Sequence, residues 1–180
     1  MRFVNRFPVL LSVCLAVTSA TSWALPSDRD QPIRIQADSA ELDDNKGVAV
    51  YRGGVIITQG TLKITGDTVT ITQNKAGDLD IFTAVGKLAY YEQVPQQGKD
   101  PVKAWGRTIQ YFAANERIVL VDQAKVVNEG NTFESEKIVY DTRRQIINAG
   151  RATGDNISAP RPRIDMTIQP RSQSGNQQAE

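Results

Sequence analysis

The sequence predicts an all-β fold. Between Pro32 and Ile168, apolar residues alternate with polar ones, and this period of two is that of a strand with one buried face. Gly, Asn and Asp cluster at intervals of roughly 8 to 12 residues, the usual spacing of turns between short strands. No comparable stretch shows the i, i+3, i+4, i+7 pattern of an amphipathic helix. Together these observations indicate an antiparallel sandwich, barrel or jelly roll.

The first 24 residues are expected to be a cleaved secretory signal peptide. Arg2 and Arg6 precede an apolar segment of about ten residues, too short for a transmembrane helix, which needs roughly 20. Ser22-Trp23-Ala24 supplies small residues at both positions that a signal peptidase reads. The alternatives are an uncleaved anchor and lipidation at Cys14, although the residue before this cysteine is not the small one usual at lipidation sites.

The mature chain is expected to start near Leu25 and to form one β domain at 25–169. A polar tail at 170–180, rich in Ser, Gln, Asn and Gly, is expected to be disordered. The segment from Gln93 to Pro101 carries two prolines and is expected to be a long loop. Loss of the two signal arginines lowers the basic residues from 21 to 19, against 20 acidic residues. This near-neutral balance without a long basic run argues against nucleic acid as a partner.

The residue types of the mature chain argue against catalysis. The sequence contains no His, and its single Cys lies in the predicted signal peptide. The pairs Asp43-Asp44 and Asp78-x-Asp80 could serve as acid and base, but both lie in turn-like segments without an evident partner. Neither pair matches the spaced oxygen ligands of a calcium loop. We therefore expect no enzyme activity, no cofactor and no metal.

The inward face of the strands is predicted from the alternation, beginning with Ile33 and Ile35 and continuing past Leu79 and Ile81. The inward residues best placed to line a groove are Ile33, Ile35, Val48, Val50, Ile57, Ile64, Ile71, Tyr91, Tyr111 and Leu120. The alternation fails before Ala89, and a bend or bulge near Gly86 would restore it. In any β sandwich these residues would simply fill the core, so the alternation alone does not separate core from ligand site.

An internal repeat relates two parts of the chain at an offset of 69 residues. Asp38 to Ile71 overlays Arg107 to Tyr140, and most apolar positions match in kind, as Val55 matches Ala124. The repeat indicates two similar sheet halves stacked along one axis.

Four segments of the sequence resemble those of a known family. They are Pro32–Asp38, Tyr51–Ile64, Gly86–Tyr91 and Ile138–Asp141. In this order, after a signal peptide, they resemble the LptA (OstA-type) family of periplasmic lipopolysaccharide transport proteins. The resemblance implies an open β-jelly roll that carries the lipid A part of lipopolysaccharide across the periplasm, with copies joined end to end.

The resemblance also assigns roles to the inward row and to the ends of the sheet. The inward residues would line a groove for acyl chains, because each methylene exposed to water costs about 0.8 kcal/mol and a chain of about a dozen carbons about 10 kcal/mol. The expected edge strands are Pro32, Ile33, Arg34, Ile35, Gln36 and Ala37 at one end, and Arg163, Ile164, Asp165, Met166, Thr167, Ile168 and Gln169 at the other. The first would pair with an inner-membrane LptC-type protein, and the second with the next copy or an outer-membrane LptD-type protein. Pro32 and Pro162 could instead block pairing, since proline cannot donate to a ladder.

Two alternatives stay open at this point. The arginines of the C-terminal third could bind lipid A phosphates or could belong to solvated turns; they are Arg143, Arg144, Arg151, Arg161 and Arg163. The whole domain could instead be a structural β-module with a packed interior that binds a protein or polysaccharide through its edges.

Overall fold

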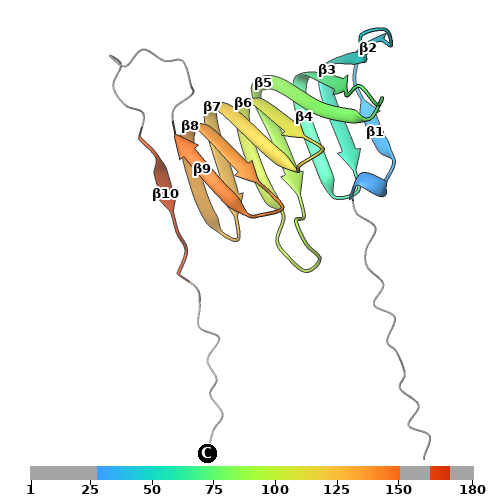
Figure 1. Cartoon of the computed structure of the whole chain (residues 1–180). Coiled ribbons are helices and arrows are strands. Elements are labelled where there is room, and N and C mark those ends of the chain that lie inside the picture. Colours follow the sequence, from blue (N-terminus) through green and yellow to red (C-terminus); the bar gives the residue numbers. More distant parts are fainter. Residues whose placement is uncertain (1–27, 151–162, 171–180) are drawn as a thin grey trace, which may run out of the picture.

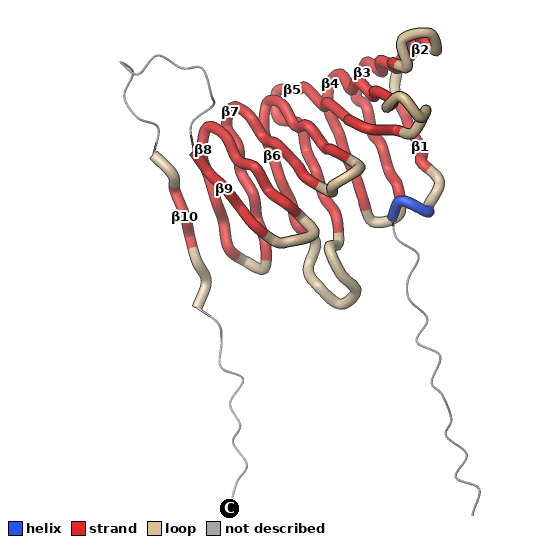
Figure 2. Tube along the Cα trace, viewed as in Figure 1, coloured by secondary structure: helices blue, strands red, loops and turns tan. Residues whose placement is uncertain are grey.

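The computed structural model describes residues 28–150 and 163–170, and these residues form one ten-stranded sheet with antiparallel pairing throughout. A short 3-10 helix, η1 (Asp28–Asp30), precedes it (Figure 2). The strands are β1 (Ile33–Gln36), β2 (Ser39–Asp43), β3 (Val48–Gln59), β4 (Leu62–Gln73), β5 (Leu79–Gln93), β6 (Val102–Phe112), β7 (Arg117–Asn128), β8 (Asn131–Asp141), β9 (Ile146–Gly150) and β10 (Asp165–Thr167). The predicted all-β class is confirmed.

The sheet is open, with short strands at both ends. Strands β3 to β8 pair in chain order, while β1 and β2 lie end to end along the free side of β3. Strands β9 and β10 share the free side of β8 in the same way. The two ends of the sheet are far apart along its stacking direction (Figure 1). Residues 94–101 join β5 and β6, as expected of a long loop.

The long strands bend at their middles, and this bend folds the sheet into two layers. The pairing register shifts once near the midpoint of every neighbouring pair from β3 to β8. The shifts lie at Arg52/Val55, Thr65/Thr68, Val85/Ala89, Trp105/Thr108 and Val121/Ala124. Bulges of this kind bend a strand and increase its twist. Because the bulges are aligned across the sheet, they produce one continuous fold line, and the irregularity expected near Gly86 is part of it.

The bend in β3 depends on two glycines with left-handed backbone. Gly53 has φ +86° and Gly54 has φ +51°. A Cβ at Gly53 would lie 2.1 Å from Oδ2 of Asp38, so a larger residue there would displace the Asp38 side chain. Two consecutive left-handed residues carry β3 round the bend without changing which numbered positions face inward: Tyr51 and Val55 lie on one side.

The predicted repeat is confirmed strand by strand. At an offset of 69 residues, β3 coincides with β7 and β4 with β8. The left-handed backbone positions repeat as well, although the residue types do not: Gly47, Gly53, Gly54 and Gly60 correspond to Glu116, Asp122, Gln123 and Glu129. The two halves therefore share one bend geometry, although different residue types adopt it.

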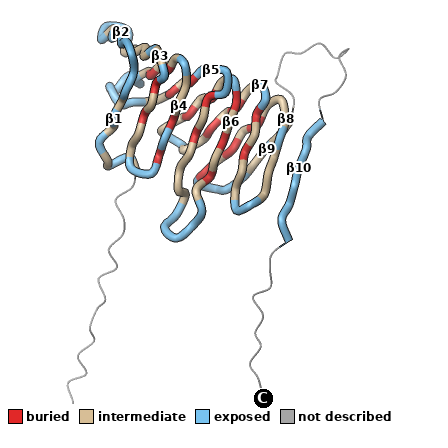
Figure 3. Tube along the Cα trace, turned by 180° about the vertical axis from the view of Figure 1, so that it is seen from behind, coloured by how far each residue is buried: buried red, intermediate tan, exposed pale blue. Residues whose placement is uncertain are grey.

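The core lies between the two layers. Buried residues concentrate in the central strands, whereas β2 and β10 are largely exposed (Figure 3). Tyr91, Tyr140 and Phe82 are the largest side chains that the core buries. The predicted signal peptide at 1–24 and nearly all of the predicted tail at 170–180 lie outside the described residues.

Candidate functional site

Aromatic side chains from opposite layers meet in the interior. The ring of Tyr111 lies 5.9 Å, centroid to centroid, from the rings of both Phe82 and Tyr91. Phe82 is the register partner of Tyr111 on the same side of the bend, whereas Tyr91 lies beyond the bend, beside Ala104. The Tyr91–Tyr111 contact therefore joins the two layers. All three aromatic side chains are at most 3% exposed.

These tyrosines are held in their neutral form. Burial raises the pKa of Tyr111 to about 12, and the nearby Glu116 carboxylate adds to the rise. Burial also raises the pKa of Tyr140 to about 12 and that of Tyr91 well above its usual value. The interior consequently presents uncharged rings over the whole physiological pH range.

Six of the ten residues predicted to line the interior lie in this inter-layer core. They are Ile57, Ile64, Ile71, Tyr91, Tyr111 and Leu120, each at most 4% exposed. Ile33 and Ile35 are half-buried on β1 and pack against the core from its N-terminal end. The strands therefore bring eight of the ten together.

Val48 and Val50 were predicted to face inward, and the structure contradicts this. Val50 pairs with Thr70, while its neighbour Tyr51 pairs with the buried Val69. Paired residues in an antiparallel sheet point to the same side, so Tyr51 and Ala49 face inward instead. The prediction failed because it assumed a change of face at Gly53-Gly54. Val48 still borders the N-terminal pocket described next.

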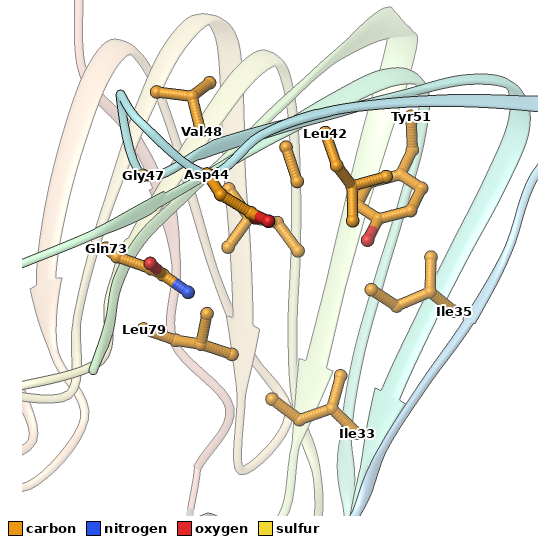
Figure 4. A pocket seen from close by; sticks show the side chains of 11 residues that line it. Ile33, Ile35, Leu42, Asp44, Gly47, Val48, Tyr51, Gln73 and Leu79 are labelled. Atoms are coloured by element: carbon orange, nitrogen blue, oxygen red, sulfur yellow. The ribbon is translucent and has the colours of Figure 1, made fainter. Parts of the chain in front are cut away.

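The interior opens at the N-terminal end of the sheet. A pocket of about 220 Å³ lies between β1, β2 and the start of β3, and Ile33, Ile35, Leu42 and Tyr51 line it. Their side chains come from three strands and face one space (Figure 4). The row of apolar side chains thus continues from the closed core to an open end.

The folded sheet is open between the strand ends near Gln59 and Gln93 and the opposite strand ends near Asp80 and Glu116; we call this opening the mouth. Two hollows larger than the N-terminal pocket lie along it. One, of about 640 Å³, is lined by residues such as Gln59, Asp78 and Phe82. The other, of about 330 Å³, is lined by residues such as Gln93 and Tyr111. Arg29 of η1 lines both, so this helix stands between the two openings.

Helix η1 is hydrogen-bonded to one side of the mouth, the lip formed by the β3–β4 turn and the end of β5. Asp28 accepts hydrogen bonds of 2.7 Å each from the Thr61 backbone N–H, the Thr61 hydroxyl and Nε2 of Gln93. Nε2 of Gln59 donates to the carbonyl oxygens of Arg29 and Gln31, at 3.2 and 3.1 Å. These bonds tie η1 to the β3–β4 turn and to the end of β5.

The predicted edge segments lie at the two ends of the sheet, with β1 first in the strand order and β10 last. Sequence reasoning missed β2 and β9, which occupy the remaining halves of the same edges. Strand β2 is almost wholly exposed, and Ile147 and Ala149 of β9 pack against the core. The inward pair on β9 was visible as the apolar run Ile146-Ile147 followed by Ala149.

The predicted phosphate-binding arginines do not form one cluster. Arg143 and Arg144 lie in the β8–β9 turn, and Nε of Arg144 is 3.7 Å from Oδ2 of Asp141. Arg163 is exposed beside β10. Arg151 and Arg161, like Pro162, lie outside the described residues.

Within residues 28–150 and 163–170, no group of three or more His, Cys, Asp or Glu side chains is placed to hold a metal ion. In the same part of the chain, no helix has the length and apolar character needed to cross a membrane.

Comparisons with known proteins agree with this architecture. The family model described as LptA/(LptD N-terminal domain) LPS transport protein matches residues 34–146. The lipopolysaccharide export system protein LptH of Pseudomonas aeruginosa is 64% identical over 171 residues, covering 95% of this chain and 98% of that protein. LptA of Escherichia coli K12 is 30% identical over 152 residues, covering 83% and 81%.

A solved structure shares the fold. The crystal structure of P. aeruginosa LptH, the LptA-homologous periplasmic component of the lipopolysaccharide transport device, superimposes with a TM-score of 0.74 at 67% identity. The match covers 81% of this chain and all of that one. The predicted open β-jelly roll is therefore confirmed.

Proposed function

This chain belongs to the LptA/LptH family of periplasmic lipopolysaccharide transport proteins, and from that membership we propose that it shields lipid A acyl chains inside its folded sheet while bridging the inner- and outer-membrane transport components. Its role is transport and not catalysis. Export requires the predicted signal peptide at 1–24, and N-terminal sequencing of the periplasmic protein tests cleavage before Leu25.

One observation carries the acyl-chain role. The apolar row of the interior does not end in the core but continues to Ile33 and Ile35, which are half-exposed and border the open N-terminal pocket. An acyl chain that leaves water for such a surface gains about 0.8 kcal/mol for each buried methylene. The pocket therefore offers a chain its first contacts, and the core residues beyond it offer the next ones.

Deeper entry of the lipid requires the two layers to separate. Ile57, Ile64 and Leu120 are buried against other side chains, so an acyl chain reaches them only by replacing contacts between the layers. The exchange costs little, because it substitutes one apolar contact for another. This proposal assigns Ile57, Ile64, Ile71, Tyr91, Tyr111 and Leu120 to lipid contact after the layers part.

A photo-crosslinking residue at Ile35 tests the acyl-chain role in living cells. Ile35 faces the pocket, and its neighbour Gln36 is exposed on the other face of β1, which makes it the matched control. We expect a covalent lipopolysaccharide adduct at Ile35 and none at Gln36. Equal labelling of both positions, or no labelling at either, would contradict the proposal. It would favour the alternative of a structural module with a packed interior.

The bridging role is assigned to the sheet edges. β1 leaves one side of its backbone unpaired, and β10 does the same at the other end among the described strands. Such edges accept a strand from another protein. We propose that β1 pairs with an LptC-type protein or a preceding copy, and β10 with an LptD-type protein or the next copy.

Deletion of Ile164–Gln169 tests the second junction. β10 pairs with only three residues of β8 and is exposed throughout, so its removal should leave a folded monomer. The truncated protein should fail to form end-to-end assemblies and to support lipopolysaccharide transport. A truncation that complements a strain lacking the protein would refute the assignment of this edge.

A further inference from the structure

Three charged groups from three separate elements meet at the mouth of the folded sheet. Nε of Arg29, in η1, lies 3.5 Å from Oε1 of Glu116, in the β6–β7 turn. Nη2 of Arg143, in the β8–β9 turn, lies 3.5 Å from the same oxygen. One carboxylate oxygen of Glu116 therefore forms ion pairs with two guanidinium groups.

This contact joins opposite ends of the strands. Asp28 ties η1 to the lip formed by Thr61 and Gln93, whereas Glu116 and Arg143 belong to turns at the other ends of the strands. A strand of twelve residues spans about 40 Å, so these lips meet only because the sheet is folded at its bulges. The Arg29–Glu116 pair thus crosses the mouth and separates its two hollows.

The two turns on the far lip form a firm base for this pair. The backbone carbonyl of Glu116 accepts hydrogen bonds from Thr142, at 3.0 Å from the backbone N–H and 2.6 Å from the hydroxyl. Thr142 is buried, so the bonds are protected from water. Glu116 and Arg143 therefore keep their relative places on the lip, while Arg29 reaches them from across the mouth.

The ion pairs themselves are weak enough to be exchanged. The side chains of Arg29, Glu116 and Arg143 are 42%, 30% and 58% exposed. Pairs this exposed contribute about 0–1 kcal/mol, and 3.5 Å is longer than the roughly 2.8 Å of a strong charge-assisted hydrogen bond. A phosphate monoester carries nearly two negative charges and three acceptor oxygens, so it satisfies two guanidinium groups better than one carboxylate does.

We propose that Arg29 and Arg143 bind a phosphate group of the lipid headgroup, and that this phosphate displaces the carboxylate of Glu116. The inference rests on the proposed carriage of lipid A, and it names the residues that bind the phosphate of the headgroup. Displacement breaks the direct link between η1 and the far lip, so headgroup binding and the parting of the two layers are coupled. Glu116 keeps both arginines at the mouth until the phosphate arrives.

Binding of two purified lipids tests the site: lipid A with its phosphates, and lipid A from which a phosphatase has removed them. Arg29→Gln and Arg143→Gln should each weaken binding of the phosphorylated lipid about tenfold and leave binding of the dephosphorylated lipid unchanged. Arg144→Gln is the matched control, since Arg144 pairs with Asp141 and not with Glu116. It should bind both lipids as the wild type does.

A variant that is expected to raise the affinity for the phosphorylated lipid separates headgroup binding from structural support. Glu116→Gln removes the competing carboxylate, so it should bind the phosphorylated lipid several-fold more tightly; a weaker affinity would point to structural support alone and overturn the site. An unchanged preference for phosphate in the Arg29→Gln/Arg143→Gln double variant would overturn the headgroup site and leave the carrier function standing. Failure of the wild type to bind either lipid would overturn both.

Discussion

Replacing Gly60 with alanine should detach η1 from the sheet. Gly60 has φ +58°, and a Cβ at this position would lie 2.2 Å from Oδ1 of Asp28. This oxygen accepts the Thr61 backbone N–H, and the other carboxylate oxygen accepts the Thr61 hydroxyl and Nε2 of Gln93. A methyl group at position 60 therefore pushes Asp28 out of all three hydrogen bonds.

The expected loss of stability has two parts. A residue with a Cβ in left-handed backbone costs about 1–2 kcal/mol. Loss of the Asp28 hydrogen bonds adds about 2 kcal/mol for the set, near the lower end for charged acceptors because Asp28 is partly exposed to water. Gly60→Ala should thus lower the free energy of unfolding by about 3 kcal/mol. Gly54 has φ +51° and no atom within 4 Å of an added Cβ, so Gly54→Ala should cost only about 1 kcal/mol.

Urea unfolding followed by circular dichroism measures both variants, and a double-mutant cycle isolates the cause. In an Asp28→Ala background, Gly60→Ala should cost only the backbone part, about 1 kcal/mol. A cost of Gly60→Ala no larger than that of Gly54→Ala would show that contact with Asp28 contributes nothing. An equal cost of Gly60→Ala with and without the Asp28 carboxylate would show the same.

Alkaline pH should unfold the protein, because the pKa of Tyr111 is raised from 10 to about 12 and the folded state holds this proton more tightly than the unfolded state. The stabilisation is complete below pH 10 and is lost as the pH rises through about 12. Tyrosinate absorbance near pH 10 that Tyr111→Phe removes, with the circular dichroism of the wild type unchanged, would contradict this. Leu120→Ala should lower the free energy of unfolding by about 3 kcal/mol, since Leu120 is fully buried. Val119→Ala, on the outer face of the same strand, should lower it by under about 1 kcal/mol. Equal urea midpoints of the two variants would show that Leu120 lies outside the core. Gln123→Gly should raise the free energy of unfolding by about 0.5 kcal/mol, because the strain relieved at φ +57° exceeds the extra backbone entropy that glycine loses on folding. A lower melting temperature would argue against strain at this position.

Local patterns were sufficient to predict the all-β fold class and the irregularity near Gly86. Period-two alternation identified the buried positions of β4, where Ile64 and Ile71 lie on either side of the bend. Lys87 could not face the interior, so the pattern itself demanded the irregularity that the structure has between Val85 and Ala89. These features depend on neighbours in the sequence.

The predictions failed where the face of a strand depends on the bulge geometry. Leu79 was expected to point inward and lines the N-terminal pocket. Ile81 was also expected to point inward, but Phe82 and Ala84 do so instead, because the β4–β5 register shifts once more between Leu79 and Ile81. The Arg29–Glu116 contact was not predicted either. It depends on how sharply the sheet folds, and alternation contains no information on that angle.

The repeat separates the length of the transport path from its width. The position of the bend within each long strand fixes the cross-section enclosed by the two layers, and the repeat places this bend at equivalent positions in β3 and β7. The unit from β3 to β6 holds four strands, so one further unit would lengthen the path by about 19 Å at the usual spacing between strands. Growth by duplication would therefore change how far such a protein reaches without changing the size of the lipid that it can enclose.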